Sequence, residues 1–276
     1  MKRNYYCQVA GLQDITLDIH KLSSGQLELR DELQATIHAD DYQLVEQLFL
    51  QYDNKNLLNL ILKNGKELDV RGIYPIAQLE ENIKAPDGSL PSYMDHFILA
   101  IKNDDPVVPG MSYENQLTTL YYEHLLNSKN SFIRNWFNFN KILTNITTAL
   151  LCRKYEMPYE FQVLGMDETA EIIRKSHARD FGVSSDFHYV EELIGIAKIE
   201  DFEEREKALD KIRWDYLDEI TFFEYFTIDR IMAFILKLGM VERWLAIDKK
   251  HGSQLFDELL QDLKSGYKLP KEFTEK

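Results

Sequence analysis

The densest basic stretch in this acidic chain is Arg174-Lys175-Ser176-His177-Ala178-Arg179. Guanidinium groups in such a stretch can hold a phosphate or a partner's carboxylates through paired hydrogen bonds. The interpretation that we favour is the last turn of a helix, where cations complement the helix dipole and pair with nearby acids. If the chain has a small-anion or partner patch, we expect it at Arg174, Lys175, His177 and Arg179.

A second group of candidate residues is acidic. The carboxylates of Asp215, Asp218, Glu219 and Glu224 are interleaved with aromatic residues between positions 214 and 225. Carboxylates packed beside rings can have raised pKa values and serve acid–base catalysis. Asp215 and Glu219 are four residues apart and share one face of a helix, whereas the aromatic residues largely occupy other faces. This spacing favours a solvated acidic face, or one that meets a basic partner.

Motifs of common enzymes are missing. Asp180-Phe181-Gly182 spells the metal-binding tripeptide of protein kinases, but the glycine-rich loop and the His-Arg-Asp loop of a kinase are absent. We expect Asp180 and Gly182 to end a helix and Phe181 to fill the core. The seven histidines are scattered, and no zinc, di-iron, phosphate-loop or dinucleotide motif occurs. The sequence therefore predicts a non-enzymatic protein with no metal and no cofactor.

Composition narrows the class of partner. The formal net charge of −14 opposes duplex nucleic acid or an anionic lipid surface as the main partner. The two cysteines, Cys7 and Cys152, are far apart, which suits a reducing compartment. The basic start of the chain has no apolar run after it, and the longest apolar stretch is too short for a membrane span. We expect a cytoplasmic protein.

The elements that position these residues are predicted to be helices, because the chain has only 12 Gly and 7 Pro. Apolar residues at steps of three and four from Phe132 to Leu150 predict a helix with a buried face that includes Trp136, and Trp214 is also expected in the core. Residues 5–10 favour a short strand or extended arm. Further helices are expected from residue 40, over 53–62, 75–84, 112–125, 167–175, 189–199, 203–223 and 228–246, and from Ser253. The predicted fold class is all-α.

We expect three helical units along the chain, and composition marks the first boundary between them. The strongest break, Asn103-Asp104-Asp105-Pro106-Val107-Val108-Pro109-Gly110, separates a first unit (1–104) from a second (105–200), and a C-terminal unit covers 201–276. The segments 53–62, 140–151 and 229–238 each begin with a polar pair and continue into an apolar helix, as expected of a weak internal repeat.

Two segments resemble a known family. The segment from Tyr52 to Leu62, with Asp53, Asn56 and Leu57, is similar to a recurrent segment of the rotor-cap family of V/A-type ATPases. The stretch from Phe226 to Trp244, with Phe234, Lys237 and Glu242, is similar to the last helix of that family. Over nearly its full length the chain also resembles a bacterial family of unknown function whose genes tend to accompany V-type ATPase genes, through segments at Tyr5, Tyr52 and Ser176.

The resemblance implies helical units in a pseudo-threefold, funnel-like arrangement. It implies a non-catalytic rotor cap that joins the central-shaft subunits of a V-type ATPase to the membrane rotor ring, and so serves ion or proton transport. Such a protein lies at the inner face of the membrane and is held there through protein contacts alone. The alternatives are a helical scaffold or adaptor unrelated to rotation, and a small-anion-binding protein or enzyme that uses the Arg174–Arg179 patch.

Overall fold

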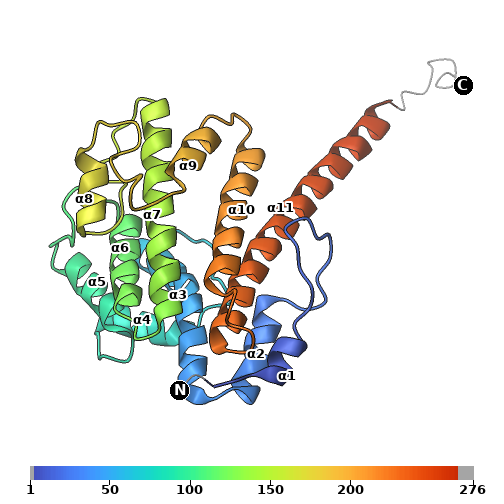
Figure 1. The fold of residues 1–276 in the computed structure, drawn as a ribbon, viewed down its shortest axis with the longest axis horizontal. Helices are drawn as coiled ribbons and strands as arrows, with labels where there is room; N and C mark the ends of the chain where they lie inside the picture. The colour runs from blue at the N-terminus through green and yellow to red at the C-terminus, as the bar shows by residue number, and fades with distance from the viewer. Residues whose placement is uncertain (1–2, 267–276) are drawn as a thin grey trace, which may run out of the picture.

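The computed structural model describes the chain from residue 3 to residue 266, and its side chains as far as residue 248. The described residues form helices and no strand, so the all-α prediction is confirmed (Figure 1). The helices are α1 (Tyr6–Ala10), α2 (Gln26–Thr36), α3 (Ala39–Leu62), α4 (Ile76–Lys84), α5 (Ser92–Lys102), α6 (Tyr113–Leu126), α7 (Ser131–Lys154), α8 (Glu168–Lys175), α9 (Val190–Ile196), α10 (Phe202–Ile220) and α11 (Ile228–Gly266).

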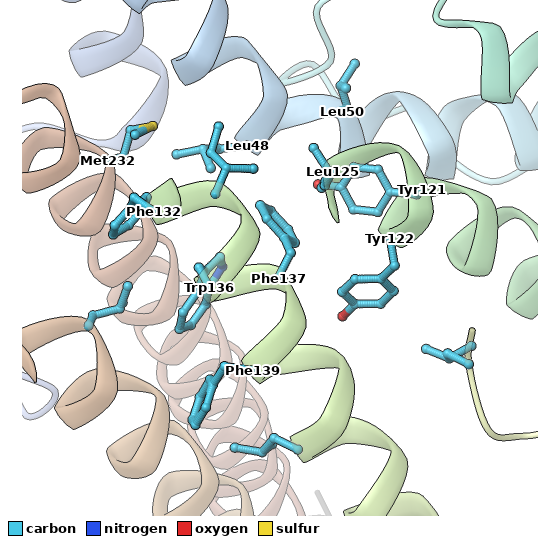
Figure 2. Close-up of a cluster of buried hydrophobic side chains, with 14 of the residues drawn as sticks. Leu48, Leu50, Tyr121, Tyr122, Leu125, Phe132, Trp136, Phe137, Phe139 and Met232 are labelled. Carbon is cyan, nitrogen blue, oxygen red and sulfur yellow. The ribbon is translucent and has the colours of Figure 1, made fainter. Parts of the chain in front are cut away.

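Helix α7 is the centre of the fold and confirms the helix predicted from the apolar stripe. Its N-cap is Asn130, whose side chain accepts a hydrogen bond from the backbone N–H of Ile133. Figure 2 shows α7 aromatic side chains pointing in two directions, with Phe137 toward Tyr121 and Tyr122 of α6 and Phe132 toward Met232 of α11. Helix α7 also packs against α8, α9 and α10. Helix α7 therefore contacts helices from both the middle and the C-terminal part of the chain.

Helix α3 differs from the prediction of two helices, because residues 39–62 form one. Its N-cap is His38, whose ring nitrogen accepts a hydrogen bond from the backbone N–H of Asp40. Asp53 was expected to begin a new helix, but its carboxylate turns inward and accepts hydrogen bonds from the connector that follows α3. A polar residue that is satisfied from outside its own helix does not interrupt that helix.

Helix α11 also joins two predicted helices into one, of 39 residues. Ser253, expected to cap a separate helix, lies inside it. In Figure 1, α11 runs antiparallel to α10 and then continues beyond the rest of the body. Its first five turns pack against the core, whereas its remaining length extends outward.

The N-terminal region contains two further differences. Residues 6–10 form the short helix α1, so the predicted strand or extended arm is wrong. The backbone N–H of Tyr5 donates to the carbonyl of Phe226, which ties this region to the start of α11. Helix α2 was not predicted. Its N-cap is Gly25, and its first N–H groups are met by the side chains of Glu28 and, from α11, Glu242.

A single cluster of buried hydrophobic residues extends from Tyr5 to Met240. Trp136 belongs to it, with 4% of its surface exposed, as predicted. Trp214 does not: it is half-buried and packs against the edge of the cluster, which corrects its placement in the core. The division into units at residues 104 and 200 falls in connectors between helices, and the three units and their funnel-like arrangement stay predictions.

Across the described part of the chain, no helix is both long enough and apolar enough to span a bilayer.

Candidate functional site

A cavity of about 710 Å³, here called the central hollow, lies among α2, α3, α7, α10 and α11. Its walls combine charged side chains with rings that come from segments far apart in the sequence. Tyr52 comes from α3, Trp136 from α7, Arg213 from α10 and Arg243 from α11. Helix α10 packs against α7 and α11, and α11 packs against α2 and α3, which brings these segments together.

One wall of the central hollow is organised by Asp210. This residue is 1% exposed, and its carboxylate accepts hydrogen bonds from Arg213 (3.0 Å), Trp244 (2.8 Å) and Arg243. The Arg213 Nε also donates to Asn140 of α7 at 3.0 Å. A buried carboxylate needs such partners because its desolvation is costly. Asp210 therefore joins α10 to α11 and fixes both arginines at the wall.

Another part of the wall is formed by Tyr52 and Arg71. The guanidinium carbon of Arg71 lies 3.9 Å from the ring centroid of Tyr52, and the same guanidinium donates to Asp69 at 2.9 and 2.8 Å. Those hydrogen bonds are the main reason that the pKa of Asp69 falls to about 2. Burial raises the pKa of Tyr52 to about 12, so its hydroxyl stays protonated and donates to Gln26 at 2.9 Å.

Three arginine side chains remain partly open to solvent at these walls: Arg71 (33% exposed), Arg213 (19%) and Arg243 (44%). They lie beside the rings of Tyr52 and Trp136. Arginine, tyrosine and tryptophan are the residues that contribute most to binding energy at protein interfaces. Each of these arginines is also paired with a carboxylate of the chain, so the wall of the central hollow combines ion pairs with rings.

Of the first segment that resembles the rotor-cap family, Tyr52 lines this hollow, whereas Asp53, Asn56 and Leu57 do not line it and lie against a connector. The Asp53 carboxylate is fully buried and accepts hydrogen bonds from the backbone N–H groups of Ile73 (2.9 Å) and Tyr74 (3.0 Å). The Asn56 amide exchanges two hydrogen bonds with the backbone of Asp69, at 2.7 and 2.8 Å. Leu57 is fully buried. These residues hold the connector that carries Arg71.

The second family segment is divided between two sites. Glu242 lines the central hollow and accepts a hydrogen bond at 2.7 Å from the backbone N–H of Gln26, at the start of α2. Lys237 pairs with Asp218 at 2.6 Å, and burial lowers its pKa. Phe234 and Lys237 line a separate cavity of about 210 Å³. Of the six family residues, Glu242 alone is among those that line the central hollow.

The basic stretch at the end of α8 forms ion pairs within the chain. Arg174 pairs with Glu171 at 2.6 Å and donates to the carbonyls of Val163 and Gly165. Lys175 also pairs with Glu171, at 3.0 Å. Arg179 pairs with Glu191 at 2.6 Å, and His177 is exposed. Arg174 and Lys175 thus share Glu171, whereas Arg179 pairs with a different residue, Glu191.

The acidic residues of α10 are likewise paired. Asp215 pairs with Lys211 and Asp218 with Lys237, while Glu219 accepts a hydrogen bond from the Tyr189 hydroxyl at 3.1 Å.

The Asp-Phe-Gly segment has a structural role. Phe181 is fully buried, as predicted, and its ring lies 3.8 Å from the guanidinium carbon of Arg153. The Asp180 carboxylate closes a local turn by accepting from Gly182 and Ser184. Within the described residues, no three His, Cys, Asp or Glu side chains are grouped so that they could hold a metal ion.

Sequence reasoning did not identify Arg71, Asp210, Arg213 or Arg243 as site residues. Asp210 and Arg213 are three residues apart and Arg243 and Trp244 are adjacent, but nothing local relates one pair to the other. Their meeting depends on the packing of α10 against α11.

The family model described as "Protein of unknown function (DUF2764)" matches residues 1–267 of the 276-residue chain. No curated protein and no solved structure matches the chain.

Proposed function

The chain belongs to the DUF2764 family of proteins of unknown function, and we propose that it is a non-catalytic rotor-cap component of a V-type ATPase. In this role it couples the central shaft to the membrane rotor ring and is held at the inner face of the membrane through those two partners. The proposal has its origin in the resemblance of the segments around Asp53 and Lys237 to the rotor-cap family.

The central hollow is the observation that carries this proposal. A rotor cap must hold the tip of a shaft on a stiff support, and the hollow places arginines and rings around a space of about 710 Å³. Its walls are joined by the hydrogen bonds of Asp210, which connect α10 to α11 and, through Arg213, to α7. A preorganised wall of this kind loses little conformational entropy on binding.

The test is a capture experiment with a steric block. Ala246 lines the central hollow and is exposed, so Ala246→Trp fills the hollow without removing a side-chain contact. Ala178 is also exposed but lies in the connector after α8, so Ala178→Trp is the matched control. The tagged full chain is incubated with detergent-solubilised V-type ATPase from the source cells. We expect the wild type and Ala178→Trp to retain shaft and ring subunits, and Ala246→Trp to lose most of the shaft subunits.

Two results would contradict the proposal. The first is a wild-type chain that retains neither shaft nor ring subunits, which leaves the scaffold or adaptor alternative. The second is equal retention of shaft subunits by Ala246→Trp and Ala178→Trp, since the hollow is then not where the shaft binds. Arg174, Lys175 and Arg179 are each paired with a carboxylate. The arginines of the hollow are paired as well, so the capture experiment, and not the pairing, separates the small-anion alternative from the proposal.

A further inference from the structure

The connection between α10 and α11 presents an exposed group of aromatic side chains. Phe222, Phe223 and Tyr225 are 66%, 80% and 63% exposed, and Phe226 is 38% exposed. Tyr6 of α1, 57% exposed, packs against Phe226 with ring centroids 4.6 Å apart. We call these five residues the aromatic surface. In Figure 1 it belongs to the end of the molecule where α10 joins α11 beside α1, opposite to the outward end of α11.

The backbone beneath these rings is held in place. Phe222 donates its N–H to Glu219, Glu224 donates to Thr221, and the carbonyl of Phe226 accepts from Tyr5. Thr221 is 2% exposed, and its hydroxyl donates to the carbonyl of Leu217 at 2.6 Å. The rings of Phe222 and Phe223 also pack edge to face, 4.9 Å apart. The aromatic surface is therefore a built feature, and exposed apolar groups of this kind mark interaction sites.

The charged groups beside the aromatic surface are mostly acidic, with Arg230 and Lys237, which both lie within 4 Å of Asp218, as the basic ones. The last turn of α10 contains Asp218 and Glu219 and no basic residue, and Glu224 follows in the connection. The carbonyl end of a helix is the negative end of its dipole, where carboxylates are unfavourable and cations are normally found. Asp218 is still 50% exposed beside its partner Lys237, and Glu219 is exposed. Because Asp218, Glu219 and Glu224 outnumber Arg230 and Lys237, the border of the aromatic surface favours cations from outside the chain.

We infer that the aromatic surface docks a basic, apolar segment of another protein, in which Leu or aromatic side chains alternate with Lys or Arg. The rings supply apolar contact area, and Asp218, Glu219 and Glu224 supply complementary charge at its border. An anionic membrane is the less favoured occupant, because those carboxylates and the net charge of −14 oppose it. This inference concerns a surface distant from the central hollow and does not depend on the proposed function.

The test uses a fluorescent helical peptide with one face of Leu and one face of Lys. Two reference peptides accompany it. The first contains Gly in place of Leu and so carries the charge without the apolar groups, and the second contains Glu in place of Lys and so carries the opposite charge. Binding is measured by fluorescence anisotropy. Phe222→Ser/Phe223→Ser removes the two rings, and Val70→Ser is the control, because Val70 is 80% exposed and lies in the connector after α3. Unfolding midpoints of all variants establish that the fold is retained.

We expect the Leu–Lys peptide to bind the wild type and Val70→Ser alike, and to bind the double variant about tenfold more weakly. The Gly–Lys peptide should bind weakly and equally to all three proteins. Equal binding of the Leu–Lys peptide to the wild type and the double variant would overturn the inference, as would equal binding of the Leu–Glu peptide. A further measurement is sedimentation of the protein with phosphatidylcholine–phosphatidylglycerol vesicles. If the wild type sediments with the vesicles, the double variant does not, and no peptide binds, the surface is assigned to a membrane instead.

Discussion

At the residue scale, the polar groups inside this protein explain more of its construction than the hydrophobic core does. Asp53, Asn56 and Asp210 are each at most 1% exposed, and each accepts or exchanges hydrogen bonds with a segment outside its own helix. An unpaired buried polar group is expensive, so each of these residues specifies which segment must pack beside it. These three buried polar residues therefore hold separate segments of the fold together.

Asp53 should make stability depend on pH in an identifiable way. Burial, the main cause, raises the pKa of this carboxyl to about 6, whereas the unfolded value is about 4. Between these two pH values the folded state binds a proton that the unfolded state does not, so this group's contribution to stability falls as pH rises through 6. Relative to Asp53→Asn, wild type should gain about 2 kcal/mol between pH 7.5 and pH 4.5, measured as the free energy of unfolding in urea. Parallel pH profiles for the two proteins would contradict this assignment.

Trp136 and Trp214 should differ in their contribution to stability. Trp136→Ala removes a 4%-exposed ring that packs near Phe139 and Tyr216, so we expect a loss of about 3–5 kcal/mol. Trp214 is half-buried beneath Lys237, whose ammonium lies 4.4 Å from the ring centroid, and Trp214→Ala should cost about 1–2 kcal/mol. Chemical denaturation of both variants measures the difference, and equal losses would show that burial does not separate them.

At the element scale, the helices that sequence reasoning identified are those whose evidence is local. The apolar stripe of α7 and the caps Ser112 and Asp167 act within a few residues, so they can be read from the chain. Helix α2 lacks a capping side chain at Gly25 and receives Glu242 from a position 216 residues away. Packing between distant segments also decides that α3 and α11 are each continuous and that residues 6–10 are helical. Local sequence patterns do not predict that packing.

Helix caps allow a matched test at this scale. Asn130 caps α7 and also donates to Asp229 of α11 at 3.1 Å, whereas Ser112 caps α6 with its hydroxyl. Ser112→Ala should therefore cost about 1 kcal/mol and Asn130→Ala about 2 kcal/mol, because the second change removes an additional contact between helices. Thermal and urea unfolding provide the comparison. A smaller loss for Asn130→Ala than for Ser112→Ala would mean that the contact with α11 contributes nothing.

At the scale of the whole molecule, the arrangement of the candidate site was beyond the reach of sequence. Glu242 was expected to matter through family resemblance, but Arg71, Arg213 and Arg243 come from three separate segments. The periodicity of apolar residues predicts which residues share a face of one helix. The lining of the hollow depends on how several helices pack together, which periodicity does not predict. The positions of Asp53 and Asn56 in the resemblance have a structural explanation, since both anchor the connector that carries Arg71.

The charge of the whole chain leads to a prediction about salt. A formal charge of −14 repels itself in the compact state, and salt screens that repulsion. Raising NaCl from about 10 to about 150 mM at pH 7.5 should raise the melting temperature by about 2–4 °C. The same series near pH 5, where the sequence has its isoelectric point of about 5.0, is the control and should show little change. A melting temperature that falls with salt at pH 7.5 would mean that attractive ion pairs outweigh the repulsion.

Helix α11 has a mechanical property that follows from its length alone. Its 39 residues span about 58 Å, and the portion after residue 248 accounts for about 27 Å of this. A tilt of about 5° where the helix passes the central hollow would displace its far end by about 3 Å, since the displacement of a lever grows with the distance from its pivot. Arg243, at that pivot, is bonded to Asp210 of α10. A small shift of this arginine by an occupant would thus be magnified into a larger movement at the far end of the helix.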